Sequence, residues 1–160
     1  MREEVLKVIK KAASEGRSFL LEHEAKYVCS LYGIPVAKSV LATSIDEALK
    51  AADELGYPVV LKIVSPDVLH KSDVGGVIVG IKDRGELVKA YNKILENVKR
   101  ANPNARIKGI LVQEMAPKGL EVIVGAIKDP FFGHAVMFGL GGIFVEVLKD
   151  VTFRVVPVTE

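Results

Sequence analysis

The sequence has very little cysteine, little excess charge and no long hydrophobic run. Cys29 is the single cysteine, which excludes an intrachain disulfide and is compatible with a reducing cytoplasm. The formal net charge is +2 over 160 residues, too balanced to indicate nucleic acid as the main partner. Its apolar runs are interrupted well before the roughly 18 residues that a membrane span needs. We therefore expect a globular, cytoplasmic protein that binds neither nucleic acid nor membrane.

The order of helical and strand patterns divides the chain into two parts. Helices and strands alternate in the first part, and Gly33, Gly56, Ser44 and Asp83 mark helix ends. The expected helices are 3–13, 22–32 and 44–55, with a fourth from residue 83 whose apolar stripe is Leu87, Val88, Tyr91, Ile94, Leu95 and Val98. From Lys108 onward the chain reads almost entirely as strand. The expected strands are 36–42, 58–64, 77–81, 110–112, 122–127, 135–138, 143–148 and 153–158. This pattern predicts an α+β (α/β) fold of two lobes that meet around residues 113–119.

The most informative segment runs from Pro58 to Val79, PVVLKIVSPDVLHKSDVGGVIV. Its apolar strand carries one lysine, Lys62, which is costly to bury unless its ammonium is paired or reaches a site. The loop that follows brings together a histidine, polar side chains and two glycines: His70, Lys71, Ser72, Asp73, Gly75 and Gly76. Lysines beside closely spaced backbone N–H groups suit phosphate, and a histidine can accept a proton or a phosphoryl group. The alternatives are a snorkelling edge lysine, a plain glycine turn and a solvated histidine, but together these residues indicate phosphoryl chemistry.

Two further segments suit a nucleotide. The strand 110–112 becomes polar at Gln113, Glu114, Met115 and Ala116 and stops at a proline, so its end could meet the edge of a purine. Glu121 begins the next strand and could reach ribose hydroxyls, a metal-bound phosphate or water. The glycines of FGLGGIFVE (138–146) indicate a close backbone approach to a ligand or a partner. The alternative interpretation of residues 110–116 is an ordinary strand end at the junction of the two lobes.

The segments at residues 22–36, 57–77 and 136–157 together resemble the nucleotide-binding β subunit of ADP-forming (NDP-forming) acetyl-CoA synthetase, which is related to succinyl-CoA synthetase. The resemblance covers the chain from Leu20 onward and implies an ATP-grasp fold, with nucleotide held between two lobes. It places an N-terminal helix at 1–20, the N-terminal lobe at 21–107 and a partial C-terminal lobe at 108–160, mostly antiparallel and incomplete.

The resemblance also implies a function and a role for particular residues. The family converts acyl-CoA, ADP and phosphate to the carboxylic acid, CoA and ATP through a phosphohistidine. A CoA-binding α subunit is the implied partner, in an α2β2 assembly. Lys62 would hold nucleotide phosphates, and Lys71, Ser72, Asp73, Gly75 and Gly76 would cover them. The residues Gln113, Glu114, Met115 and Ala116 would line the adenine. Glu121 would lie near ribose or phosphate, and His70 would be a second phosphoryl acceptor or a phosphate-stabilising group.

The resemblance implies ATP or ADP and Mg²⁺ as cofactors, with the metal ligands largely in an acidic segment beyond Glu160. Because phosphoryl transfer relies on metal to neutralise charge, we expect this chain alone to be inactive. The alternatives are another ATP-grasp ligase that activates a carboxylate, and a non-catalytic nucleotide-binding module.

Overall fold

The computed structural model describes residues 1–142 and 151–159, and the chain divides into two compact units, Met1–Ala116 and Pro117–Glu160. Helices and antiparallel sheets are both present, in agreement with the expected α+β class. The first unit carries four helices and a four-stranded sheet, whereas the described part of the second carries a three-stranded sheet.

The sheet of the first unit contains strands β1 (Ser39–Ala42), β2 (Val59–Val64), β3 (Val77–Ile81) and β4 (Gly109–Glu114), in the order β1-β4-β2-β3. All three pairings are antiparallel. Lys62 lies opposite Leu111 of β4, and Val60 lies opposite Gln113. Because side chains alternate between the faces of a strand, Lys62 and Gln113 project from the same face of the sheet.

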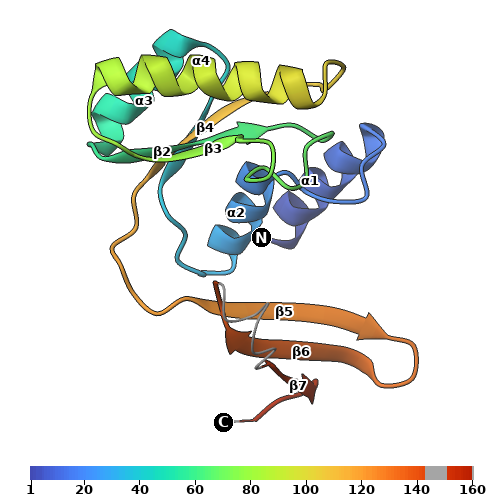
Figure 1. Ribbon diagram of the computed structural model, residues 1–160. Coiled ribbons are helices and arrows are strands. Elements are labelled where there is room, and N and C mark those ends of the chain that lie inside the picture. Colours follow the sequence, from blue (N-terminus) through green and yellow to red (C-terminus); the bar gives the residue numbers. More distant parts are fainter. Residues whose placement is uncertain (143–150, 160) are drawn as a thin grey trace. The chain divides into compact units, whose positions relative to one another are not determined.

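Helices α3 (Ile45–Leu55) and α4 (Arg84–Ala101) cover the opposite face (Figure 1). Each begins where a side-chain oxygen accepts a backbone N–H: Ser44 Oγ from Glu47 at 3.2 Å, and Asp83 Oδ1 from Glu86 at 2.8 Å. Between these helices and the sheet lies the main core. Its largest fully buried members are Val59, Leu61, Ile63, Leu87, Ile94, Val98, Ile110 and Val112.

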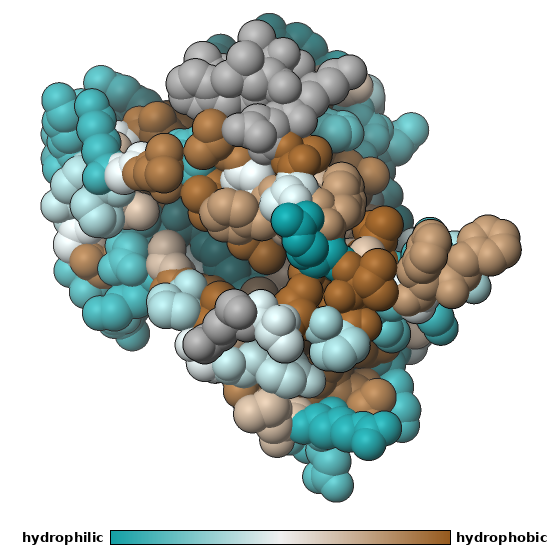
Figure 2. Space-filling model, turned by 90° about the horizontal axis from the view of Figure 1, so that it is seen from below, coloured by the Kyte–Doolittle hydropathy of each residue, from teal (hydrophilic) through white to brown (hydrophobic). Residues whose placement is uncertain are grey.

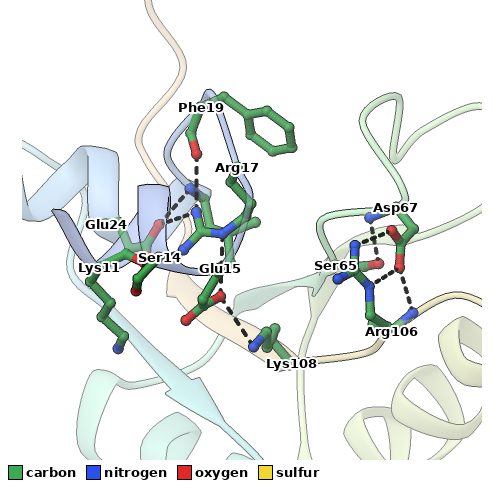
Figure 3. A network of polar contacts seen from close by, with 11 residues as sticks. Lys11, Ser14, Glu15, Arg17, Phe19, Glu24, Ser65, Asp67, Arg106 and Lys108 are labelled. Atoms are coloured by element: carbon green, nitrogen blue, oxygen red, sulfur yellow. Dashed lines mark hydrogen bonds and ion pairs between the residues drawn. The ribbon is translucent and has the colours of Figure 1, made fainter. Parts of the chain in front are cut away.

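Helices α1 (Arg2–Ser14) and α2 (Glu22–Leu31) lie on the same side of the sheet as Lys62 (Figure 1). Here Leu21 packs against Val64 and Leu111 in a second, smaller core. In the loop between the two helices, the buried Arg17 guanidinium donates to both carboxylate oxygens of Glu24, at 2.7 and 2.8 Å (Figure 3). Glu24 also accepts the Leu21 backbone N–H at 2.8 Å, so the ion pair fixes the start of α2.

In the second unit, β5 (Val122–Asp129), β6 (Gly133–Leu140) and β7 (Val151–Val155) pair antiparallel in that order. At the β5–β6 turn, Asp129 Oδ1 accepts the N–H groups of Phe131 and Phe132, each at 2.8 Å. Several apolar side chains of this unit are exposed, and Figure 2 shows hydrophobic residues at the surface seen from below. The expected strand 143–148 lies outside the described residues.

Several sequence-based expectations differ from the structure. The expected strand 153–158 is β7, which begins at Val151 and ends at Val155. The first strand starts at Ser39 and not at residue 36, after an irregular approach from Gly33. Val88 was expected on the apolar stripe of α4 but is exposed, while Ala90 is buried in its place. Residues 109–114 were expected in the C-terminal lobe that begins at 108. They form β4, which belongs to the first sheet because it pairs with both β1 and β2.

Within residues 1–142 and 151–159, no helix is both long and apolar enough to cross a membrane.

Candidate functional site

A pocket of about 560 Å³ opens on the α2 side of the first unit. It takes Lys62 from β2, Val77 from β3, Glu22 from α2, and Leu69, His70, Lys71, Ser72 and Asp73 from the β2–β3 loop. The structure thus gathers five of the predicted site residues around one cavity: Lys62, His70, Lys71, Ser72 and Asp73.

Glu22, the first residue of α2, joins the lysines of this site. Its Oε1 accepts from Lys62 Nζ at 2.8 Å and lies 3.4 Å from Lys26 Nζ, and its Oε2 accepts from Lys71 Nζ. All four side chains are mostly buried, with 19 to 24% of each exposed. We refer to Glu22, Lys26, Lys62 and Lys71 as the lysine cluster.

The lysine cluster is electrostatically unbalanced. Burial acts to raise the pKa of the Glu22 carboxyl, but hydrogen bonds from Lys62 and Lys71 outweigh it and bring this pKa from 4.5 to about 2. Burial lowers the pKa of Lys26, and the charges of Lys62 and Lys71 act in the same direction. Three ammonium groups around one carboxylate leave two positive charges in excess. An anion is the complementary ligand.

Lys26 extends the cluster to the strand end predicted to line a purine. Its Nζ donates to Oε1 of Gln113 on β4. The next residue, Glu114, accepts the Lys38 backbone N–H at 2.7 Å and donates its own N–H to the Lys38 carbonyl at 3.0 Å. Met115 is 44% exposed just beyond the strand. A continuous set of polar contacts therefore connects the phosphate-suited loop with Gln113.

Sequence reasoning missed Glu22 and Lys26. The only sequence signal that could have found them is their i,i+4 spacing, which places both side chains on one face of a helix. It gives no indication that this face lies over Lys62, forty residues later in the chain.

The loop from Ser65 to Gly76 is fixed at both ends. At its start, Arg106 donates to both Asp67 oxygens, from Nε at 3.0 Å and from Nη2 at 2.7 Å (Figure 3). These hydrogen bonds, with one from the Arg106 backbone, lower the pKa of Asp67 to about 2. At its end, Asn97 donates to the Gly75 carbonyl at 3.0 Å. His70 lies exposed between the two anchors.

Both predicted glycines at the end of this loop are tightly placed. The N–H of Gly75 donates to the Ser72 carbonyl at 3.1 Å, and that of Gly76 to the Lys71 carbonyl at 2.7 Å. A Cβ on Gly76 would lie 2.6 Å from Cγ2 of Ile63. In this structure the two N–H groups therefore hold the loop together, and the cationic character of the pocket comes from lysine side chains.

Glu121 lies in the second unit, against the predicted glycine turn. Its carbonyl accepts the Gly141 N–H at 2.8 Å, and a Cβ on Gly142 would lie 2.8 Å from its Oε2. Gly142 also has a φ of 64°, which favours glycine. The close approach that these glycines allow is thus an approach to Glu121.

The described residues contain no group of three or more His, Cys, Asp or Glu side chains arranged to hold a metal ion. The pocket lining includes two lysines, Lys62 and Lys71, and two carboxylates, Glu22 and Asp73. Glu22 is already paired with Lys62 and Lys71. Residues 1–142 and 151–159 by themselves therefore supply no magnesium site.

Comparison with known proteins identifies the fold and the family. The sequence model of an ATP-grasp domain family matches residues 11–160. The β subunit of ADP-forming acetate–CoA ligase II from Pyrococcus furiosus is 52% identical over 160 residues, which are 100% of this chain and 68% of the relative.

A solved acetyl-coenzyme A synthetase 1 of Ca. Korarchaeum cryptofilum, in complex with coenzyme A and Ca-AMPCP, is 59% identical with a TM-score of 0.92. The match covers 96% of this chain and 67% of that one. Another structure of that enzyme holds coenzyme A and Mg-AMPPCP, with its phosphohistidine segment pointing towards the nucleotide binding site. It is 51% identical with a TM-score of 0.80, over 97% of this chain and 65% of that one.

The chain belongs to the ATP-grasp family of ADP-forming acetate–CoA ligase β subunits. It spans about two thirds of the length of the β subunits that it matches.

Proposed function

We propose that this chain supplies the nucleotide-phosphate site of an ADP-forming acetyl-CoA synthetase. The observation that carries the proposal is the pocket lined by Lys62, Lys71 and His70. It adjoins the lysine cluster, in which three ammonium groups surround one carboxylate and leave an excess of positive charge. Its relatives act on acetate and coenzyme A by name, which supports the same reaction class for the protein that contains this chain.

In this proposal each predicted residue keeps a defined role. Lys62 and Lys71 donate to phosphate oxygens, and the loop with Ser72, Asp73, Gly75 and Gly76 encloses them. Charge-assisted hydrogen bonds of this kind hold a phosphate in a fixed orientation. The strand end Gln113, Glu114, Met115 and Ala116 lines the base, and Glu121 of the second unit approaches the ribose.

The phosphoryl group reaches ADP in three balanced steps. Phosphate attacks acyl-CoA to give acyl phosphate and CoA. A histidine nitrogen takes the phosphoryl group and releases the carboxylate, and an oxygen of ADP then takes it from the nitrogen. We assign the first steps to a CoA-binding α subunit in an α2β2 assembly. The phosphohistidine segment of the Korarchaeum enzyme supports such a carrier.

We propose His70 as a second phosphoryl acceptor. In support, it is exposed and lines the same pocket as Lys62 and Lys71. With the α subunit present, we expect His70→Asn to lower ATP formation at least a hundredfold, while ADP binding changes by less than threefold. Phosphorylation at the histidine is measured by acid-labile ³²P incorporation. Full ATP formation by the variant would contradict this role.

Nucleotide binding in the family is accompanied by Mg²⁺, which neutralises phosphate charge. We expect its ligands outside residues 1–142 and 151–159 and assign no step to it here. A reducing, cytoplasmic location is proposed from the single cysteine.

Isothermal titration with ADP, with and without Mg²⁺, tests the nucleotide site. We expect Lys62→Ala to weaken ADP binding tenfold to a hundredfold, because it removes about 1.5 to 3 kcal/mol of charge-assisted hydrogen bonding. Lys99→Ala is the matched control, since Lys99 is exposed on α4 across the sheet. Equal affinities for the wild type and Lys62→Ala would contradict the proposed site.

A further inference from the structure

Glu22 already binds the two ammonium groups that the proposed function assigns to phosphate. Its two oxygens bind Lys62 and Lys71, the same two ammonium groups that line the pocket. A carboxylate offers two oxygens on one carbon, which resembles one edge of a phosphate group in both charge and geometry.

We propose that Glu22 is an internal competitor of the nucleotide phosphates, holding Lys62 and Lys71 until phosphate replaces it. This inference rests on the proposed function, because it concerns the same lysines. It assigns a role to a residue that sequence reasoning had missed. Binding of an anion then means that Lys62 and Lys71 exchange the Glu22 carboxylate for phosphate.

The competition follows from charge. When phosphate oxygens bind Lys62 and Lys71, the Glu22 carboxylate stays within a few ångströms of them and repels them. In a mostly buried cluster this repulsion is screened less than at the surface. Lys26 lowers the free-energy cost of separating Glu22 from Lys62 and Lys71. Its Nζ lies 3.4 Å from Glu22 and can keep the carboxylate paired after the exchange.

A purely structural Glu22 predicts the opposite outcome. If the carboxylate only aligned the lysines for phosphate, its removal would leave them misplaced and would weaken binding. The sign of the change in affinity therefore separates a competitor from a positioning group.

The experiment measures binding of ADP and of inorganic tripolyphosphate to the full 160-residue chain by calorimetry, at low and at high salt. We expect Glu22→Gln to bind both ligands about tenfold more tightly at low ionic strength, and this gain to shrink with added salt. Glu22→Asp keeps the charge and is expected to show no gain.

Asp53→Asn is the matched control, since it removes the same charge from an exposed ion pair with Arg84 on the other side of the sheet. It should leave both affinities unchanged. A gain in Asp53→Asn equal to that in Glu22→Gln would reduce the effect to net charge and overturn the inference.

The remaining outcomes are also decisive. If the wild type binds ADP, Lys62→Ala weakens binding at least tenfold and Glu22→Gln binds equally or more weakly, the inference fails and the proposed nucleotide site stands. If neither the wild type nor Glu22→Gln binds ADP or tripolyphosphate, both fail.

Discussion

Arg17 and Glu24 are charged residues that are buried, where an unpaired charge is unfavourable. Their side chains are 3% and 9% exposed, and the guanidinium also donates to the Phe19 carbonyl at 3.0 Å (Figure 3). A buried ion pair of this kind adds little net stability, but removing one partner leaves the other charge without compensation. The pair therefore fixes the geometry of the α1–α2 loop, and through it the position of α2.

We expect Glu24→Gln to lower the free energy of unfolding by about 3 kcal/mol, because the buried Arg17 would lose its two-oxygen partner and keep the longer ion pair of its Nε with Glu15 at 3.3 Å. Urea denaturation followed by circular dichroism measures the change. Glu4→Gln breaks the exposed pair with Lys7 and serves as the control, with no measurable loss expected. If Glu24→Gln and the wild type were equally stable, the Arg17–Glu24 pair would not be needed to hold the α1–α2 loop in place.

At the residue scale, Lys62 could be predicted and Glu22 could not. A lysine inside an apolar strand is conspicuous because burial without a partner is costly, so the sequence itself indicates a site. A glutamate at the start of a helix is ordinary, since acidic side chains favour that position. Only the packing of α2 over the sheet gives Glu22 its lysine partners.

The β2–β3 loop is the element on which the site depends. Anchors at Asp67 and Asn97 hold its ends, and Gly76 packs directly on Ile63 of the neighbouring strand. The Ile63 N–H also donates to the Gly76 carbonyl at 2.8 Å. The glycine pair thus lets the loop return to the sheet at close range.

We expect Gly76→Ala to destabilise the protein by about 1 to 3 kcal/mol, because the added methyl group overlaps Ile63 and the Lys71 carbonyl. Thermal unfolding measures the stability, and an ADP titration measures the accompanying loss of affinity. Gly119→Ala is the control, since a Cβ there would meet no atom within 4 Å. A Gly76→Ala protein as stable as Gly119→Ala would mean that the loop adjusts without cost.

At the element scale, local signals predicted the helices well. The capping residues Ser44 and Asp83 and the glycines at 33 and 56 define where α2, α3 and α4 begin or end. Strand β4 was expected in the C-terminal lobe, and the structure places it in the first unit for a physical reason. The apolar pattern of a strand is local, whereas its pairing partners depend on the whole fold. No local pattern shows that residues 110–113 pair with 39–42.

In the whole molecule, the two faces of the first sheet carry different kinds of residues. The face under α3 and α4 carries the main core, and the face under α2 carries Lys62 and Gln113. The sequence predicted members of both faces. It did not predict that Lys26 connects the lysine cluster with Gln113 on the second face, because that contact joins residues 26 and 113. Residue types could be predicted, whereas their convergence depends on tertiary structure.

The strand order β1-β4-β2-β3 also governs how this protein can be made. β4 is the last of the four strands to leave the ribosome, yet it lies between β1 and β2 and bonds to both. During translation, β1 has no strand partner until residue 114 has emerged. Only then can the four-stranded sheet form. Nascent chains that stop earlier leave unpaired the edges of β1 and β2 that β4 would cover. Recognition by chaperones matters most at this stage, because unpaired strand edges favour aggregation.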